Sequence, residues 1–173
     1  MTDPLIRPAM SDDAADLIAY IQELTAEPGI QLLTGAGEFN KTVDEEMRYI
    51  QEMSDGGNSA IFLAYSGDQL VGEINLRGGS RRAERHTAVL GISVRRAWRG
   101  MGLGSRLLGT AMEWARAQSP LKRIELRVIA ENQPAIHLYG KFGFQVEGRR
   151  KRSIYLGGRY LDDLIMAVWL EGR

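Results

Sequence analysis

The sequence predicts a single mixed α/β domain, because two hairpin patterns and a strand–loop–helix pattern share one chain. Apolar runs at 60–65 and 70–76 flank the turn Ser-Gly-Asp-Gln, which is typical of a β-hairpin. A second, longer hairpin is expected at 144–156 and 160–170, around two consecutive glycines. Between them, residues 86–94 alternate as a strand and lead into a glycine-rich loop and an apolar helix. This order favours a sheet with helices packed on it.

Caps and breakers locate most of the other elements. Residues 5–8 have the pattern of a short first strand, and Ser11 is expected to cap the first helix. Thr42 and Glu45 form a capping box that opens a second helix. The helix after the glycine loop is expected to end near Gln118, before a proline.

A fifth strand is predicted at 123–130, and Asn132 is expected to cap a short helix that carries Pro134 in its first turn and stops at Gly143. In total the chain is expected to form seven strands and about four helices.

The composition limits the possible functions. The chain has 173 residues, of which 44% are apolar and 25% charged, as in an ordinary soluble domain spanning residues 1–173. It contains no cysteine, which excludes disulfides, thiolate metal ligands and an acyl-cysteine intermediate. Two histidines are too few for a histidine-rich metal site, so we expect metal-free chemistry. The apolar run 164–170 is too short to cross a bilayer, and the beginning of the sequence lacks a signal-peptide pattern, so a cytoplasmic location without a membrane partner is expected.

Charge is unevenly distributed along the sequence. Residues 1–76 carry 14 acidic and 3 basic side chains, whereas residues 77–127 carry 12 basic and 3 acidic ones. One interpretation is an ordinary solvated surface. The other is a polyanionic ligand beside the basic block, with a cationic ligand possible beside the acidic block. A nucleic acid is not expected, because Trp98 and Trp114 are the only aromatic residues of the basic block.

Three glycines at alternate positions, Gly100, Gly102 and Gly104, lie between the fourth strand and the next helix. A helix N-terminus presents unpaired backbone N–H groups, and glycines let an anion approach them, so the pattern favours a phosphate ligand. A P-loop is excluded, because Ser105 and Arg106 follow where lysine and Ser/Thr are required. The spacing also departs from a dinucleotide-binding fingerprint. A glycine-rich loop needed only for packing stays open.

The segment RGMGLG (99–104) resembles the R/Q-x-x-G-x-G/A signature of the GNAT superfamily of acyl-CoA N-acetyltransferases. ELRVIAENQPAIHLYGKFGF (125–144) is similar to the second part of that family's core, and SIYLGGRYLDDLIMAVWL (153–170) to the end of bacterial members that acetylate amino acids, polyamines or protein N-termini. The resemblance implies a mixed, mostly antiparallel, seven-stranded twisted sheet with about four helices on its two faces. It also makes a homodimer plausible.

The resemblance implies acetyl-CoA as co-substrate, in a gap between the fourth and fifth strands. The pantetheine arm would pair with backbone near Ile92, Ser93 and Val94, and the Ser105 hydroxyl and Asn132 would contact the ligand. Backbone N–H groups would hold the pyrophosphate, at Arg99, Gly100, Met101, Gly102 and Gly104. Tyr139 matches the family tyrosine that faces the sulfur.

Amide formation from a thioester needs a base for the amine and an acid for the thiolate. Tyr139 is the candidate acid. Many relatives have a carboxylate on the fourth strand, but this sequence has Val89 and Leu90 there, so the identity of the base stays open. Glu73 on the third strand is the best carboxylate, as the base or as a group that binds the substrate, and His86 is a candidate relay through water; the alternative for Glu73 is a surface or sheet-pairing role. Glu73 is expected to face a cleft because it is opposite in phase to three apolar residues, Leu70, Ile74 and Leu76.

We expect direct attack of a primary amine, such as the α-amino group of an amino acid, on acetyl-CoA. Asp162 or Asp163 is a candidate to hold a cationic amine. The basic cluster at 81–86 is either a solvated loop or a site for an anion. The alternatives are a protein N-terminus as acceptor and a CoA-binding sensor without turnover. The segment 27–41, which is expected to help choose the acceptor, has no interpretable motif.

Overall fold

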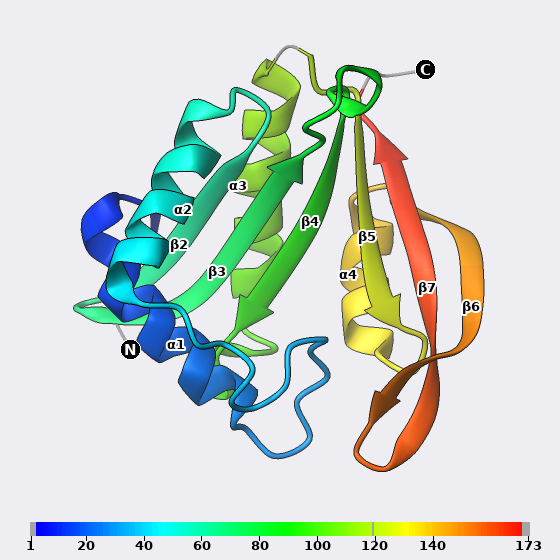
Figure 1. The fold of residues 1–173 in the computed structure, drawn as a ribbon. Coiled ribbons are helices and arrows are strands. Elements are labelled where there is room, and N and C mark those ends of the chain that lie inside the picture. The colour runs from blue at the N-terminus through cyan, green and yellow to red at the C-terminus, as the bar shows by residue number, and fades with distance from the viewer. Residues whose placement is uncertain (1–2, 119, 171–173) are drawn as a thin grey trace.

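The computed structural model describes residues 3–118 and 120–170 of the chain. Seven strands form one sheet in the order β1-β2-β3-β4-β5-β7-β6 (Figure 1). Neighbouring strands are antiparallel except for β4 and β5, which are parallel. The strands are β1 (Leu5–Pro8), β2 (Ala60–Ser66), β3 (Gln69–Gly78), β4 (Thr87–Val94), β5 (Arg123–Ile129), β6 (Gln145–Leu156) and β7 (Arg159–Trp169). The predicted seven-stranded, mostly antiparallel fold is therefore confirmed.

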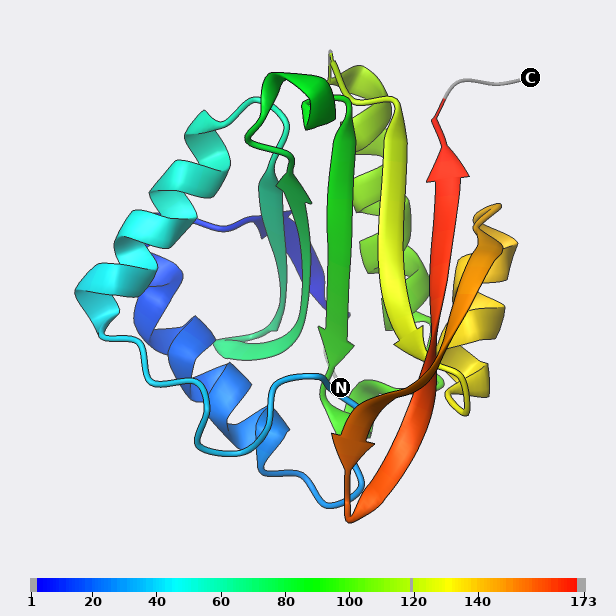
Figure 2. The same ribbon diagram turned by 45° about the vertical axis from the view of Figure 1, so that its right-hand side comes forward.

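Four α-helices cover the sheet, two on each face, as Figure 2 shows. Three 3₁₀ turns, at Ser11–Asp13, Arg82–Glu84 and Arg96–Trp98, connect elements. The helices are α1 (Ala14–Thr25), α2 (Val43–Asp55), α3 (Leu103–Ala117) and α4 (Gln133–Lys141). None of the helices in the described part of the chain is long and apolar enough to span a membrane.

Each face of the sheet has its own core. On one face, fully buried Leu107 and Met112 of α3 belong to a cluster with Leu126 of β5. On the other, Leu17 of α1 and Ile50 of α2 pack with residues of β2. Full burial of a Leu or Ile side chain contributes about 1.5–3 kcal/mol, so these two layers hold the helices against the sheet.

The predicted caps are confirmed at two helices and wrong at one. The Thr42 hydroxyl accepts from the Glu45 N–H at 3.3 Å, and the Asn132 side chain accepts from the Ala135 N–H at 3.2 Å. Ser11, however, lies inside a 3₁₀ turn that precedes α1, and Asp13 occupies the N-cap position.

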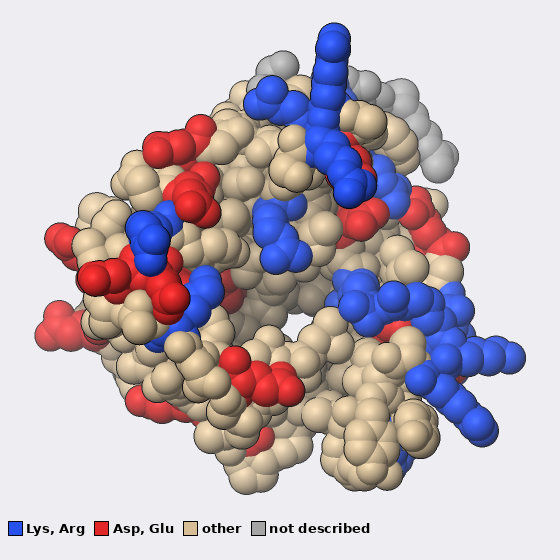
Figure 3. All heavy atoms as spheres, in the orientation of Figure 1, with Lys and Arg blue, Asp and Glu red and all other residues tan. Residues whose placement is uncertain are grey.

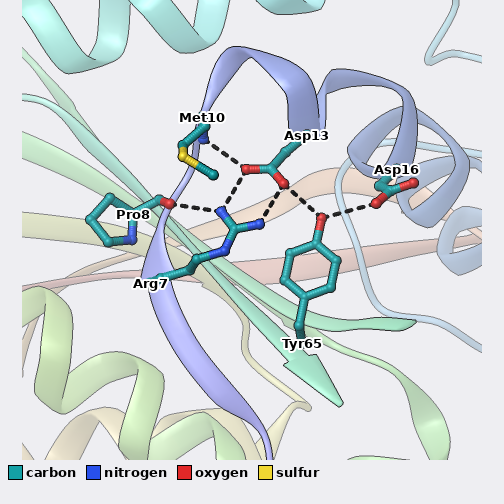
Figure 4. A network of polar contacts seen from close by, with 6 residues as sticks. All are labelled: Arg7, Pro8, Met10, Asp13, Asp16 and Tyr65. Carbon is teal, nitrogen blue, oxygen red and sulfur yellow. Dashed lines mark hydrogen bonds and ion pairs between the residues drawn. The ribbon is translucent and has the colours of Figure 1, made fainter. Parts of the chain in front are cut away.

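The reason is a polar network around Asp13 (Figure 4). Its carboxylate accepts two hydrogen bonds from Arg7, at 2.6 and 2.7 Å, and one from the Met10 N–H at 2.7 Å. Tyr65 donates to the same carboxylate at 3.0 Å, and its hydroxyl also lies 3.1 Å from Asp16. The network ties the beginning of α1 to β1 and β2, so the chain leaves its extended conformation at Met10, and Ser11 already lies inside the helical segment.

A bulge in β3 changes the phase that the sequence predicts for Leu70. The β2–β3 register passes from Ala64–Gly72 to Tyr65–Leu70, which leaves Val71 as an extra residue. Ile74 packs in the cluster with α3, but Leu70 packs in the cluster with α1 and α2. The expectation that Leu70 shares a face with Ile74 is therefore wrong.

Candidate active site

The site lies where β4 and β5 separate. The two parallel strands pair only through Thr87–Arg123, Ala88–Ile124 and Val89–Glu125, after which β4 stays with β3 and β5 stays with β7. A cavity of about 990 Å³ opens along this gap. It is the hollow near the centre of Figure 3. The cavity is lined by residues of β3, β4, the glycine loop and α4.

Ile92, Ser93 and Val94 line this cavity on β4, beyond the last residue that pairs with β5. Their backbone groups on the β5 side have no strand partner in the described sheet. This strip is where the sequence predicted pairing with an extended ligand, and the Val94 carbonyl in it accepts a hydrogen bond from Arg99 Nε at 2.8 Å.

The glycine loop forms one end of the same cavity. Gly100 and Gly102 have φ of 75° and 86°, a left-handed conformation that glycine adopts without strain. A Cβ at either position would meet no heavy atom within 4 Å, so both face open space. Gly104 lies in the first turn of α3, and its Cβ would approach Leu138 to 3.3 Å.

The beginning of α3 provides free donors. The first hydrogen bond of the helix joins the Arg106 N–H to the Gly102 carbonyl at 3.1 Å. The N–H groups of Leu103, Gly104 and Ser105 precede it and have no acceptor within the helix. With the positive end of the helix dipole, they form a cradle that suits a phosphate or pyrophosphate group.

The side chain of Arg99 is directed away from such an anion. Its guanidinium lies 2.7 Å from Glu27, and its Nε donates to the Val94 carbonyl at 2.8 Å. These contacts anchor the glycine loop to the end of β4 and to the segment after α1. Met101 is 59% exposed and does not line the cavity. At Arg99 and Met101, therefore, the predicted contact with a pyrophosphate is left to the backbone N–H groups.

Tyr139 of α4 lines the cavity from the other side of the gap and is 6% exposed. Its ring packs against Phe144, with ring centroids 5.8 Å apart. Burial raises the pKa of Tyr139 to about 12, so the phenol is protonated at neutral pH. A protonated phenol at this place is a hydrogen-bond donor to a group in the gap.

Glu73 of β3 lines the cavity and is half-buried there. Its Oε1 accepts from Asn75 at 2.6 Å, and Ser93 Oγ lies 3.4 Å from its Oε2. The Ser93 hydroxyl is itself 3.0 Å from Tyr20 OH. Removal of the carboxylate from water raises its pKa to about 7, an effect that the hydrogen bonds from Asn75 and Ser93 oppose.

A cation–π cluster borders Glu73 on the side of α2. Lys41 lies 2.7 Å from the buried carboxylate of Glu46 and 3.8 Å from the Tyr49 ring centroid. Its charge is therefore neutralised within the protein. Arg77, two residues beyond Asn75, also lines the cavity and makes no hydrogen bond or ion pair with the described residues.

Asp163 of β7 is fully buried and already has two cationic partners. Arg127 Nε donates to it at 2.8 Å, and Arg150 donates at 2.5 and 3.0 Å; the Ser153 hydroxyl donates as well. Burial alone would raise the pKa of Asp163, but these donors outweigh it and hold the pKa well below its usual value. Asp162 similarly binds Arg149 at 2.7 Å. The expectation that either aspartate holds a cationic amine is therefore not supported by their surroundings.

The structure thus brings Glu73, Tyr139, Asn132, Ser105 and the glycine loop to one cavity. His86 is not among its lining residues. It precedes β4 and lies seven residues before Ser93, roughly 23 Å along an extended strand, too far for a relay to Glu73 through one water molecule.

Comparison with known proteins agrees with this geometry. The model of the acetyltransferase (GNAT) family matches residues 25–144. This chain belongs to the acetyltransferase (GNAT) family. It is 33% identical over 111 residues to the L-amino acid N-acetyltransferase AaaT of Escherichia coli, an alignment covering 64% of this chain and 68% of AaaT. It is 24% identical over 166 residues to the spermidine N(1)-acetyltransferase of the same organism, covering 95% and 84%. A solved GNAT acetyltransferase from Streptococcus pneumoniae superposes with a TM-score of 0.92 at 31% identity, covering 96% of this chain and 99% of the other.

The family assignment confirms the predictions of an acetyltransferase and of a GNAT fold. The match of the family model ends at residue 144, so the β6–β7 hairpin with Asp163 and Arg150 lies outside it.

The polar cavity residues that the sequence did not single out include Asn75, Arg77 and Arg127. Tyr20, which contacts the cavity residue Ser93, was also missed. Asn75 and Arg77 follow Glu73 at alternate positions, so the period of a strand would have placed them on its face. Tyr20 lies three residues after Leu17 and resembles an ordinary core residue in a helical pattern. The sequence carried no signal for Arg127, because its position depends on Asp163, 36 residues away.

Proposed function

We propose that this protein transfers the acetyl group of acetyl-CoA to the primary amine of a small molecule by direct attack. The observation that carries the proposal is the convergence on one cavity of an anion cradle, a gap between parallel strands, a protonated phenol and a carboxyl group with a pKa near 7. An amino acid is the favoured acceptor, since AaaT, a relative at 33% identity, is named as an L-amino acid N-acetyltransferase.

The residues of the cradle fit the diphosphate of acetyl-CoA. The free N–H groups at the beginning of α3 bind the anion, and the Ser105 hydroxyl adds a donor on the same wall. Gly100 and Gly102 keep side chains out of the approach. When bound, acetyl-CoA supplies an activated thioester. The Ile92 N–H, on the side of β4 that has no strand partner there, polarises its carbonyl.

Tyr139 acts on the leaving group. Its pKa of about 12 lies above that of an ordinary thiol, about 8.5, so complete proton transfer from the free enzyme's phenol to a thiolate is uphill. The phenol therefore stabilises the developing thiolate mainly through a hydrogen bond that strengthens as charge appears on sulfur.

Glu73 acts on the amine. A carboxyl group with a pKa of about 7 is substantially ionised at neutral pH, yet is basic enough to accept a proton from the bound ammonium before attack, or from the amine nitrogen as it attacks. Asn75 fixes one oxygen through its 2.6 Å hydrogen bond, which leaves the other, near Ser93, for the substrate. The chain has no cysteine, so the amine attacks the thioester directly.

The test is thiol release from acetyl-CoA in the presence of amino acids, polyamines, aminoglycosides and N-terminal peptides. The protein has no cysteine, so it gives no background with a thiol reagent. Acceptor-dependent release with a small primary amine is the expected result. Acetyl-CoA binding without release for any amine would contradict turnover and indicate a CoA-binding sensor, and no binding at all would contradict the role of the glycine loop.

A further inference from the structure

We propose that the amine acceptor also carries an anionic group, such as a carboxylate, and that Arg127 binds it. The inference rests on the proposed acetyltransferase function and specifies the substrate class. It is carried by one cluster at the edge of the cavity, formed by Asp163 with Arg127 and Arg150.

The cluster has an excess of positive charge. One fully buried carboxylate holds two guanidinium groups, so the three residues carry a net charge of +1. Arg127 uses only its Nε for Asp163, and its side chain is 41% exposed. Its terminal nitrogens therefore remain for an anion, and Asp163 fixes the direction of the guanidinium. Figure 3 shows a gathering of basic side chains beside the central hollow.

Arg127 and Glu73 lie on the same face of the sheet, on opposite sides of the gap. Leu126 and Val128 of β5, like Ile74 of β3, pack in the core with α3. The residues that alternate with them, Arg127 and Glu73, therefore point to the other face. Only β4 lies between their strands, so two strand spacings, about 10 Å plus the opening of the gap, separate their backbones. Long side chains reaching from both sides leave room for an amine near Glu73 and an acid group near Arg127.

The other charges of the cavity argue against a polycation such as spermidine. The described cavity residues include three carboxylates, Glu46, Glu73 and Asp163. Glu46 is neutralised by Lys41, and Asp163 by two arginines. Only Glu73 is left, and it has no second carboxylate to bind the far end of a polyamine. Arg77, which has no ion-pair partner among the described residues, makes the cavity more positive still.

The experiment compares an acceptor that carries a carboxylate with its uncharged amide and with a polyamine. Steady-state rates are measured for the amino acid that reacts best, for its C-terminal amide and for spermidine. We expect the wild-type kcat/KM for the amino acid to exceed that for the amide at least tenfold, because a charge-assisted hydrogen bond is lost. In Arg127→Gln this ratio is expected to fall toward one, while the Kd for acetyl-CoA is unchanged.

The matched control is Arg149→Gln on β6. Arg149 also binds an aspartate, Asp162, at 2.7 Å, but it does not line the cavity, so its loss should leave the ratio as in the wild type. Equal or better turnover of spermidine or of the amide by the wild type would overturn the anionic acceptor alone. Collapse of the ratio in Arg77→Gln but not in Arg127→Gln would overturn the assignment to Arg127. No turnover of any amine would overturn the proposed function and this inference with it.

Discussion

Glu73 of β3 and Ser93 of β4 are paired in register, and the Ser93 hydroxyl lies 3.4 Å from Glu73 Oε2. The fourth strand, β4 (Thr87–Val94), carries no carboxylate of its own. The carboxyl group comes from the neighbouring strand, while β4 contributes a hydroxyl held at 3.0 Å by Tyr20. The two strands therefore place a titratable group at the floor of the cavity without a charged residue on β4 itself.

Replacement of Glu73 by Gln should remove the ascending limb on the acidic side of the pH–rate profile. Because the pKa of Glu73 is about 7, wild-type kcat should rise with pH through about 7 as the carboxylate ionises. Glu73→Gln should lower kcat by about 10²–10⁴-fold and abolish that rise. The pH profile of kcat under saturating acceptor and acetyl-CoA gives the answer. An unchanged limb in the variant would show that another group titrates.

The same substitution should increase stability at high pH. Burial raises the pKa of Glu73 from about 4.5 to about 7, so the wild type loses stability as pH rises through this range. Relative to the wild type, the free energy of unfolding of Glu73→Gln should increase by about 1–3 kcal/mol between pH 4.5 and 8. This energy is smaller than the pKa shift alone would give, because the Glu73 side chain is only half-buried. Urea unfolding across this range measures it, with Glu52→Gln on the exposed side of α2 as a control that should show no such trend.

Tyr139→Phe separates catalysis from binding. The change removes one hydroxyl and keeps the ring packed against Phe144. We expect kcat to fall about 10–10³-fold, with less than a threefold change in the Kd for acetyl-CoA, because the hydrogen bond strengthens only when charge develops on sulfur. Stopped-flow or steady-state kinetics together with calorimetric binding distinguish the two effects. Loss of affinity equal to the loss of rate would contradict the assigned role.

Local signals predicted most of the fold. The Thr42 and Asn132 caps, the two hairpins and the glycine loop each depend on residues close in sequence, so they could be recognised one at a time. Two predictions were wrong, at Ser11 and at Leu70, because a distant contact or a change of strand register outweighs the local pattern. Arg7 and Tyr65 hold Asp13 and move the helix cap, and an extra residue at Val71 reverses the strand's phase.

The cavity was predictable only on the cofactor side. The glycines, Asn132 and Tyr139 lie in two short segments with a recognisable spacing. The acceptor side depends on pairs such as Arg127 with Asp163 and Tyr20 with Ser93, which are 36 and 73 residues apart. The net charge around Asp163 could not be predicted from the sequence. Two arginines on other strands pair with this aspartate and make the cluster positive.

Gly102→Ala should weaken acetyl-CoA binding beyond its effect on stability. At φ 86° an alanine costs about 1–2 kcal/mol, and its Cβ projects into the open space of the cradle. We expect the Kd for acetyl-CoA to rise about tenfold or more in a variant that is still folded at 25 °C. Gly140→Ala is the matched control: Gly140 lies within α4, its Cβ would meet no heavy atom within 4 Å, and alanine there favours the helix. A Gly102→Ala protein that binds acetyl-CoA normally would show that the loop is a turn and not a cradle.

Asp13→Asn should destabilise the protein at neutral pH and do so less at low pH. Hydrogen bonds from Arg7, with those from Met10 and Tyr65, lower the pKa of the Asp13 carboxyl against the opposing effect of burial. A lowered folded-state pKa contributes stability above the unfolded value, near 3.8, and that stability is lost as pH falls below it. We expect the free energy of unfolding to fall by about 2–3 kcal/mol at pH 7, because Arg7 loses its charged partner, and by much less near pH 2.

Thermal unfolding from pH 7 to 2 measures the difference, with Asp12→Asn at the exposed neighbouring position as control. A cost that is constant over this range, or equal in the two variants, would mean that the network in Figure 4 does not depend on the charge of Asp13.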